Sequence, residues 1–87
     1  MTATSEWYMY VVQCADGTLY TGITNNLKRR LNEHNYSSRG AKYTKSRRPV
    51  KYCMTVLCTN HSEAAKEEAK FKKLSRKKKL EIINDRK

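Results

Sequence analysis

The sequence is poor in the residues that mark several protein classes. Its 87 residues include only three glycines and one proline, so a glycine-rich phosphate loop is excluded. No apolar run reaches the roughly 18 residues of a membrane span. Residues 1–6 lack the basic start and apolar stretch of a signal peptide. The three cysteines are odd in number and form no CxxC pair, which favours reduced thiols over disulfides or a zinc site. We therefore expect a cytoplasmic protein without membrane attachment.

Acidic residues are also scarce. Eight Asp and Glu stand against 19 Lys and Arg, for a formal net charge of +11. Residues 1–27 contain no Lys or Arg, so every basic residue lies in residues 28–87. This asymmetry predicts a polyanionic partner, with nucleic acid as the first candidate. A basic surface that is merely solvated, or an acidic protein partner, is the alternative.

The length allows one domain, residues 1–87, with its core at about residues 6–84. Residues 7–14 are apolar on both faces, which is typical of a central strand, and residues 19–23 form a second strand. Residues 50–58 predict a third strand, in which Tyr52, Met54 and Val56 share one face. Helices are predicted over residues 26–35, from Asn60 through residue 74, and over residues 76–84. The order is β-β-α-β-α-α.

The turn at Asp16-Gly17 decides which side chains share a face of the first hairpin. A two-residue turn pairs Gln13 with Tyr20 and leaves Tyr10 on the other face. A three-residue loop pairs Val12 with Tyr20, and Tyr10 then becomes a diagonal neighbour, with the Cα atoms roughly 7–8 Å apart. Gly17 can supply the positive φ that the three-residue loop needs.

Three ionisable residues occupy positions where apolar residues are expected. Arg30 and His34 fall on or beside the helical stripe marked by Leu27 and Leu31. Glu68 lies on the apolar face of the next helix, where an unpaired charge is costly. Its expected partner is a metal, an arginine or a backbone donor. Spacing alone leaves both a structural ion pair and a functional site open.

Residues 36–49 are predicted to form a polar loop rich in basic residues. Basic side chains interleaved with an aromatic ring suit contacts to a nucleic-acid backbone and one stacked base. A mobile solvated loop is the alternative. With two residues from the C-terminal helices, the predicted nucleic-acid contacts are Arg39, Lys42, Tyr43, Lys45, Arg47, Arg48, Lys72 and Arg76.

Taken together, these segments resemble the GIY-YIG nuclease superfamily, and more narrowly its small stand-alone YhbQ/UPF0213-like members. The likeness covers residues 7–83. It rests on Tyr8-Met9-Tyr10, Tyr20-Thr21-Gly22, the helix signature at residues 27–34, the segments 40–44 and 48–50, and the acidic helix at 68–76. The resemblance implies an α+β fold with a three-stranded antiparallel sheet flanked by helices. It also implies two neighbouring motif tyrosines, which favours the three-residue loop.

The resemblance further implies a metal-dependent endonuclease that hydrolyses DNA phosphodiester bonds, in repair or recombination. In that case Tyr20 is the general base, Tyr10 orients the site, and Arg30 contacts the scissile phosphate. His34 occupies the position that holds a His or Tyr in family sites. Glu68 is the carboxylate ligand of one divalent ion, Mg²⁺ or Mn²⁺. Because one carboxylate binds Mg²⁺ weakly, the ion is expected to bind mainly with substrate.

The sequence departs from the family pattern at Ile23, where some family nucleases carry a lysine. We expect no targeting domain beyond Lys87, and therefore expect the basic loop and the last helix, or a protein partner, to supply the substrate contacts. The alternative function is a nucleic-acid-binding module with this fold and little or no catalytic activity. A monomer is expected, associated with the nucleoid if the source is bacterial.

Overall fold

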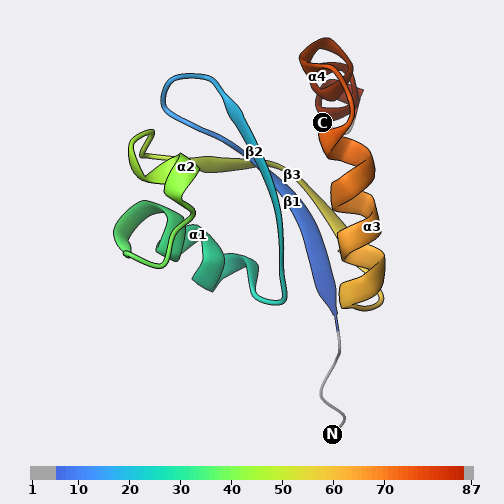
Figure 1. The fold of residues 1–87 in the computed structure, drawn as a ribbon, viewed down its shortest axis with the longest axis horizontal. Coiled ribbons are helices and arrows are strands. Elements are labelled where there is room, and N and C mark those ends of the chain that lie inside the picture. Colours follow the sequence, from blue (N-terminus) through green and yellow to red (C-terminus); the bar gives the residue numbers. More distant parts are fainter. Residues whose placement is uncertain (1–5, 86–87) are drawn as a thin grey trace, which may run out of the picture.

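Three strands and four helices follow one another along residues 6–85, the part of the chain that the computed structural model describes (Figure 1). Residues 1–5 and 86–87, the ends of the predicted 1–87 domain, lie outside the described part of the chain. Most of the N-terminal segment 1–6, which is expected to carry no signal peptide, is therefore also outside it. The strands are β1 (Trp7–Gln13), β2 (Leu19–Thr24) and β3 (Lys51–Cys58). The helices are α1 (Leu27–Tyr36), α2 (Lys42–Lys45), α3 (His61–Lys72) and α4 (Arg76–Asp85). The predicted α+β class is confirmed, but the expected loop at 36–49 contains the short helix α2.

The sheet has the order β2-β1-β3 and is antiparallel throughout. β1 is therefore the central strand, as its apolar composition predicts. A backbone bond of 2.8 Å from Cys14 N to Thr18 O closes a three-residue loop, in which Gly17 has a φ of 85°. Val12 pairs with Tyr20, and this confirms the register that places Tyr10 and Tyr20 on the same face.

The predicted alternation of β3 is wrong at one point. Val11 of β1 pairs with Met54, but the next residue, Val12, pairs with Tyr52, so Cys53 is an extra residue in a β-bulge. An inserted residue reverses which face the rest of the strand presents. Tyr52 therefore faces α1, whereas Met54 faces α3. The sequence pattern conceals the bulge because Cys53 is itself apolar and fits the run on either side.

Each face of the sheet is covered by different helices, with α1 and α2 on one side and α3 on the other (Figure 1). The α3 side holds an apolar cluster of Met9, Val11, Met54, Phe71 and Ile83. The α1 side holds a second cluster of Tyr10, Val12, Cys14 and Val50, against which Leu27 and Leu31 pack. Within residues 6–85, no helix combines the length and the apolar character that crossing a membrane requires.

Candidate functional site

Tyr10 is the centre of the site on the α1 side of the sheet. Its side chain is 1% exposed, and the ring of Tyr52 packs edge-on against it at 5.4 Å between centroids. Gly22 lies opposite on β2, where a Cβ atom would come within 2.5 Å of the Tyr10 hydroxyl oxygen. The absence of a side chain at Gly22 thus lets the phenol ring cross β2.

Helix α1 brings Arg30 and His34 to the same place. The helix begins at Asn26, whose side-chain oxygen accepts a bond of 3.0 Å from the backbone N–H of Arg29. Arg30 and His34 are four residues apart and share one face of the helix. His34 is fully buried, and its Nε2 lies 2.7 Å from the Tyr10 hydroxyl. The Nε–H of Arg30 donates to the same hydroxyl oxygen at 3.4 Å.

The hydrogen bonds of Thr44, in α2, determine the direction of this network. The Thr44 hydroxyl donates to the carbonyl of Ala41 at 2.9 Å, which uses its only proton. At the other contact, 3.0 Å from His34 Nδ1, Thr44 must therefore accept, so that Nδ1 carries the imidazole proton. Nε2 is then bare and accepts the proton of Tyr10. The bonds run in one direction from Arg30 through Tyr10, His34 and Thr44 to Ala41.

The ionisation of the buried groups agrees with these directions. Burial, followed by the charge of Arg30, lowers the pKa of His34 to about 4, so the ring is neutral at pH 7. Burial raises the pKa of Tyr10, although the hydrogen bond and charge of Arg30 act against this. Tyr10 therefore stays protonated and serves as a hydrogen-bond donor, which disqualifies it as a base at neutral pH.

The guanidinium of Arg30 is held on three sides. Besides Tyr10, it bonds Glu33 Oε1 at 2.9 Å and the carbonyl of Arg39 at 3.0 Å, both through Nη1. Within residues 6–85 its Nη2 group makes no hydrogen bond, and the side chain is 23% exposed. Arg30 thus offers one unused pair of N–H groups to an anion.

Tyr20 lies beside His34 with its hydroxyl unused. The rings of Tyr20 and His34 are 5.5 Å apart and meet edge-on. Tyr20 is half-buried, and in the described part of the chain its hydroxyl has no hydrogen-bond partner. Of the two motif tyrosines, only Tyr20 therefore has a hydroxyl that is available to an incoming molecule.

Glu68 lies on α3, the helix that packs across β1 and β2 from the face of the sheet opposite α1 (Figure 1). Its carboxylate is 23% exposed and acts, as a minor contribution, to raise the pKa of Tyr10. The ionic partner is Lys72, with Nζ at 3.2 Å from Oε2, rather than an arginine. Of the three partners expected for Glu68, an arginine is not the one found, because Arg30 is already paired with Glu33. A lysine one turn along the same helix is the simpler partner.

The donor atoms of the site fit one kind of metal ion. Across residues 6–85, no three His, Cys, Asp or Glu side chains gather in a metal-binding group. Glu68 is half-buried on α3 and offers a single carboxylate. Mg²⁺ is commonly held by one or two carboxylates, with water and substrate phosphate completing the octahedron. The residues present therefore fit an ion that binds together with a phosphate-bearing substrate.

The predicted nucleic-acid contacts divide into two groups. Arg48 is used inside the fold, where its guanidinium donates to the carbonyls of Glu33, His34 and Ser37 at the end of α1. Arg47 is also used, since it pairs with Asp16 at 3.1 Å and covers the ring of Tyr43 at 4.1 Å. The remaining predicted side chains are exposed, although two of them also have partners. These are Arg39, Lys42, Lys45, Lys72 paired with Glu68, and Arg76 bonded to the Gly17 carbonyl.

Tyr43 lies in a short helix and packs against another tyrosine, whereas the sequence predicts it in a polar loop. Its ring stacks on Tyr20, with 5.8 Å between centroids and an interplanar angle of 25°. It is 39% exposed and lies in α2, one residue before Thr44. Sequence reasoning missed the roles of α2 and Thr44, although residues 40–44 belong to the motif set that marks the resemblance. That motif segment, which includes Thr44, was the sequence feature that could have indicated a role for this threonine.

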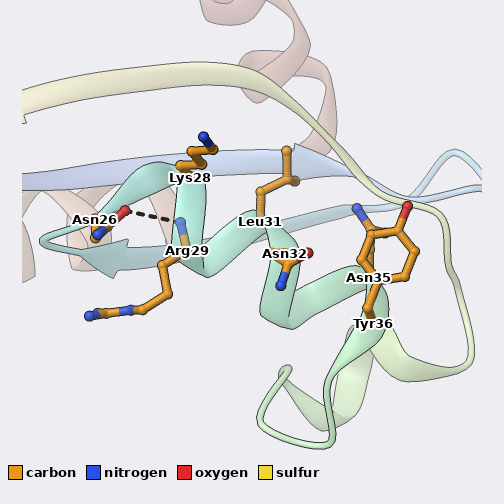
Figure 2. Close-up of a pocket in the computed structure, with 7 residues that line it drawn as sticks. All are labelled: Asn26, Lys28, Arg29, Leu31, Asn32, Asn35 and Tyr36. Carbon is orange, nitrogen blue, oxygen red and sulfur yellow. Dashed lines mark hydrogen bonds between the residues drawn. The ribbon is translucent and has the colours of Figure 1, made fainter.

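A groove with both polar and apolar lining runs along α1, away from the predicted site (Figure 2). Lys28, Asn32 and Asn35 line it, and the exposed ring of Tyr36 stands at its end. Leu31, which packs against the cluster around Tyr10, also lines this groove, whereas Tyr20, Arg30 and His34 do not. Asn35 has a structural task there, because its amide exchanges two hydrogen bonds with the backbone of Val50 at 3.0 and 2.7 Å.

Comparisons with known proteins agree with the fold and the motifs. A family profile described as "GIY-YIG catalytic domain" matches residues 6–81. The UPF0213 protein of Syntrophus aciditrophicus is 51% identical over 79 residues, which cover 91% of each chain. The UPF0213 protein DP2720 of Desulfotalea psychrophila is 53% identical over 77 residues, 88% of this chain and 70% of that one.

Two solution NMR structures are also similar. The protein EF2693 from E. faecalis has a TM-score of 0.63 and 42% identity, over 99% of this chain and 92% of that chain. The UPF0213 protein BH0048 from Bacillus halodurans has a TM-score of 0.59 and 38% identity, over 91% and 83%.

Proposed function

Because the chain belongs to the GIY-YIG catalytic-domain family, whose fold is a nuclease fold, we propose that it is a metal-dependent endonuclease that hydrolyses DNA phosphodiester bonds. The observation that carries this proposal is the unused hydroxyl of Tyr20 beside the bonded chain of Arg30, Tyr10 and His34. The proposed setting is DNA repair or recombination. In this proposal the protein acts as a monomer in the cytoplasm, with DNA as its partner, and is associated with the nucleoid if the cell is bacterial.

Hydrolysis of a phosphodiester requires an oriented water molecule and neutralisation of charge on the phosphate. In this proposal Tyr20 reacts in its phenolate form, binds the attacking water and accepts its proton. The free Nη2 group of Arg30 binds an oxygen of the scissile phosphate. Tyr10 and His34 take no proton from the water, because their bonds are already satisfied; they hold Arg30 in place instead. The water oxygen forms the new bond to phosphorus, the bond to the 3′ oxygen breaks, and that oxygen takes a proton from solvent water to leave as a 3′-hydroxyl.

Glu68 is the residue that would hold a divalent ion, Mg²⁺ or Mn²⁺. Bound there, such an ion would supply charge neutralisation for the phosphate and the leaving oxygen. Lys72 competes for the same carboxylate in the free protein, at 3.2 Å. We therefore expect Mg²⁺ to bind the DNA-free protein with millimolar or weaker affinity, measured by calorimetry or NMR titration. Lys72→Met should tighten this binding, whereas a micromolar site in the unmodified protein would contradict the proposed donor set.

The direct test is cleavage of labelled single-stranded, duplex and branched DNA with Mg²⁺ or Mn²⁺. Tyr20→Phe and Glu68→Gln should each reduce the rate by about a hundredfold or more, since each removes a group to which the proposal assigns a role in the reaction. Two matched controls carry the same chemical changes elsewhere. Tyr36→Phe alters an exposed tyrosine on α1, and Glu67→Gln alters a carboxylate that pairs with Lys70.

The controls should cut at the unmodified rate. Equal cutting by all five proteins would refute the site. Absence of cutting by the unmodified protein, with DNA binding that weakens steeply as salt rises, would instead favour the nucleic-acid-binding module. The net charge of +11 favours DNA binding whether or not the protein is an enzyme, so only the cleavage assay separates the two functions.

A further inference from the structure

We propose that Thr44 is a positioning residue, which fixes the proton of His34 on Nδ1 and thereby sets the donor and acceptor roles of Tyr10 and Arg30. The inference deepens the proposed nuclease function and rests on it for its effect on catalysis. Its geometric part concerns only residues within 6–85 and can be tested in the protein without DNA.

Thr44 is placed for this task by α2. Its side chain is fully buried, and both its backbone N–H and its hydroxyl donate to the Ala41 carbonyl, at 3.0 and 2.9 Å. The hydroxyl cannot also donate to His34, because it has a single proton. Its oxygen, 3.0 Å from Nδ1, can only accept there and therefore selects the ring form in which Nδ1 carries hydrogen.

The other form of His34 would disturb the site. With hydrogen on Nε2, the ring would direct an N–H toward the Tyr10 oxygen, at the position where Tyr10 now donates. Arg30 already donates to that oxygen, so the phenol proton would have no acceptor among these groups. A buried donor without an acceptor is unfavourable, because it has lost its hydrogen bonds to water without replacement. Tyr10 or Arg30 would have to move to relieve it, and Arg30 is the proposed phosphate contact.

The same short helix also touches the second motif tyrosine. Tyr43, the neighbour of Thr44, stacks on Tyr20 at 5.8 Å, and Tyr20 meets His34 at 5.5 Å. α2 therefore contacts both tyrosines of the motif, Tyr10 through His34 and Tyr20 directly. The segment between α1 and β3 therefore not only connects these two elements but also contacts the side chains of the site.

The test uses Thr44→Val, which keeps the shape and removes the hydroxyl, beside Thr44→Ser, which keeps the hydroxyl. Long-range ¹H–¹⁵N NMR of the DNA-free protein reports which nitrogen of His34 carries the proton. Unmodified protein and Thr44→Ser should have hydrogen on Nδ1, whereas Thr44→Val should have a substantial Nε2-bound fraction. Cleavage by Thr44→Val should fall by about ten- to a hundredfold, the usual range for a lost outer-shell partner, and Thr44→Ser should retain most of it.

Two results would overturn the inference. One is an Nε2-bound proton in the unmodified protein, which decides the matter even if Thr44→Val does not fold. The other is a folded Thr44→Val variant that keeps both the Nδ1 proton and full activity. If the unmodified protein cuts no DNA while the tautomer changes as expected, the nuclease proposal fails and the positioning of Tyr10 by Thr44 stands.

Discussion

The two faces of the sheet are covered by different kinds of side chain, apolar on one face and largely polar on the other. On the α3 side, Met9, Val11 and Phe71 form an apolar cluster. On the α1 side, the buried groups include Tyr10, His34 and Thr44, each tied by hydrogen bonds. Burial of polar groups is tolerated only where their bonds are satisfied, so the second face stabilises the fold less and specifies geometry more. Substitutions on the first face should change stability, and substitutions on the second should change the site.

The largest expected effect is on the apolar face. Phe71 is 4% exposed in the cluster, and Phe71→Ala should lower the free energy of unfolding by about 3–5 kcal/mol. That is a large share of the stability of a domain this size. Urea denaturation measures it, with Leu57→Ala as control, since Leu57 is 59% exposed on β3 and should change stability by less than about 1 kcal/mol. Similar losses in both variants would remove the distinction between core and surface.

The next effect is a pH dependence that belongs to the polar face. Burial, then the charge of Arg30, lowers the pKa of His34 from 6.5 to about 4; Arg48 adds to the lowering and Glu33 opposes it. The unfolded chain therefore binds a proton more readily than the folded one. The stabilisation is fully present above pH 6.5 and is lost as the pH falls toward 4, by up to about 3 kcal/mol.

Urea denaturation between pH 7 and pH 4.5 measures this slope. His34→Gln removes the ionisable ring and should flatten the curve over that interval. A variant as pH-sensitive as the unmodified protein would show that other groups cause the slope, and the buried imidazole would then have no special energetic role.

A smaller effect should follow from closing the space above Gly22. A Cβ atom there would lie 2.5 Å from the hydroxyl oxygen and 2.7 Å from Cζ of Tyr10, a ring that has little room to move. Gly22→Ala should cost about 1–3 kcal/mol and reduce DNA cleavage at the same time. Gly17→Ala is the matched control, because it strains a positive φ of 85° in a turn with no atom near the added methyl. It should lose stability by about 1 kcal/mol and keep the proposed activity. Loss of activity in both would mean that the effect is general.

Much of this architecture is readable from the sequence, for physical reasons. The central position of the first strand follows from the doubly apolar run at residues 7–13. Gly17 is compatible with the three-residue loop, but the choice of hairpin register rested on the resemblance, which implies two neighbouring motif tyrosines. The bulge at Cys53 has no signature, because one extra apolar residue leaves the pattern intact. α2 is four residues long, too short for a helical period to appear.

The side-chain partners were harder to predict than the elements. Arg30, His34 and Glu68 stand out because charge or polarity on an apolar stripe needs compensation. The identity of each partner depends on tertiary placement, which spacing does not contain. Thr44 and Tyr52 have ordinary sequence surroundings, and only the fold brings them to His34 and Tyr10.

The smallest effects separate basic residues that serve the fold from those that face solvent. Arg48→Ala removes donors from three carbonyls at the end of α1 and should lower the free energy of unfolding by about 1–2 kcal/mol. Lys45 is exposed, so Lys45→Ala should leave stability within about 0.5 kcal/mol. If Lys45 contacts a phosphate, its loss should also reduce the slope of log affinity against log salt by about one. The opposite assignment, with Arg48 changing the salt slope and Lys45 the stability, would mean that the basic loop rearranges when DNA binds. The division between a structural and a DNA-facing set of cations would then hold only for the free protein.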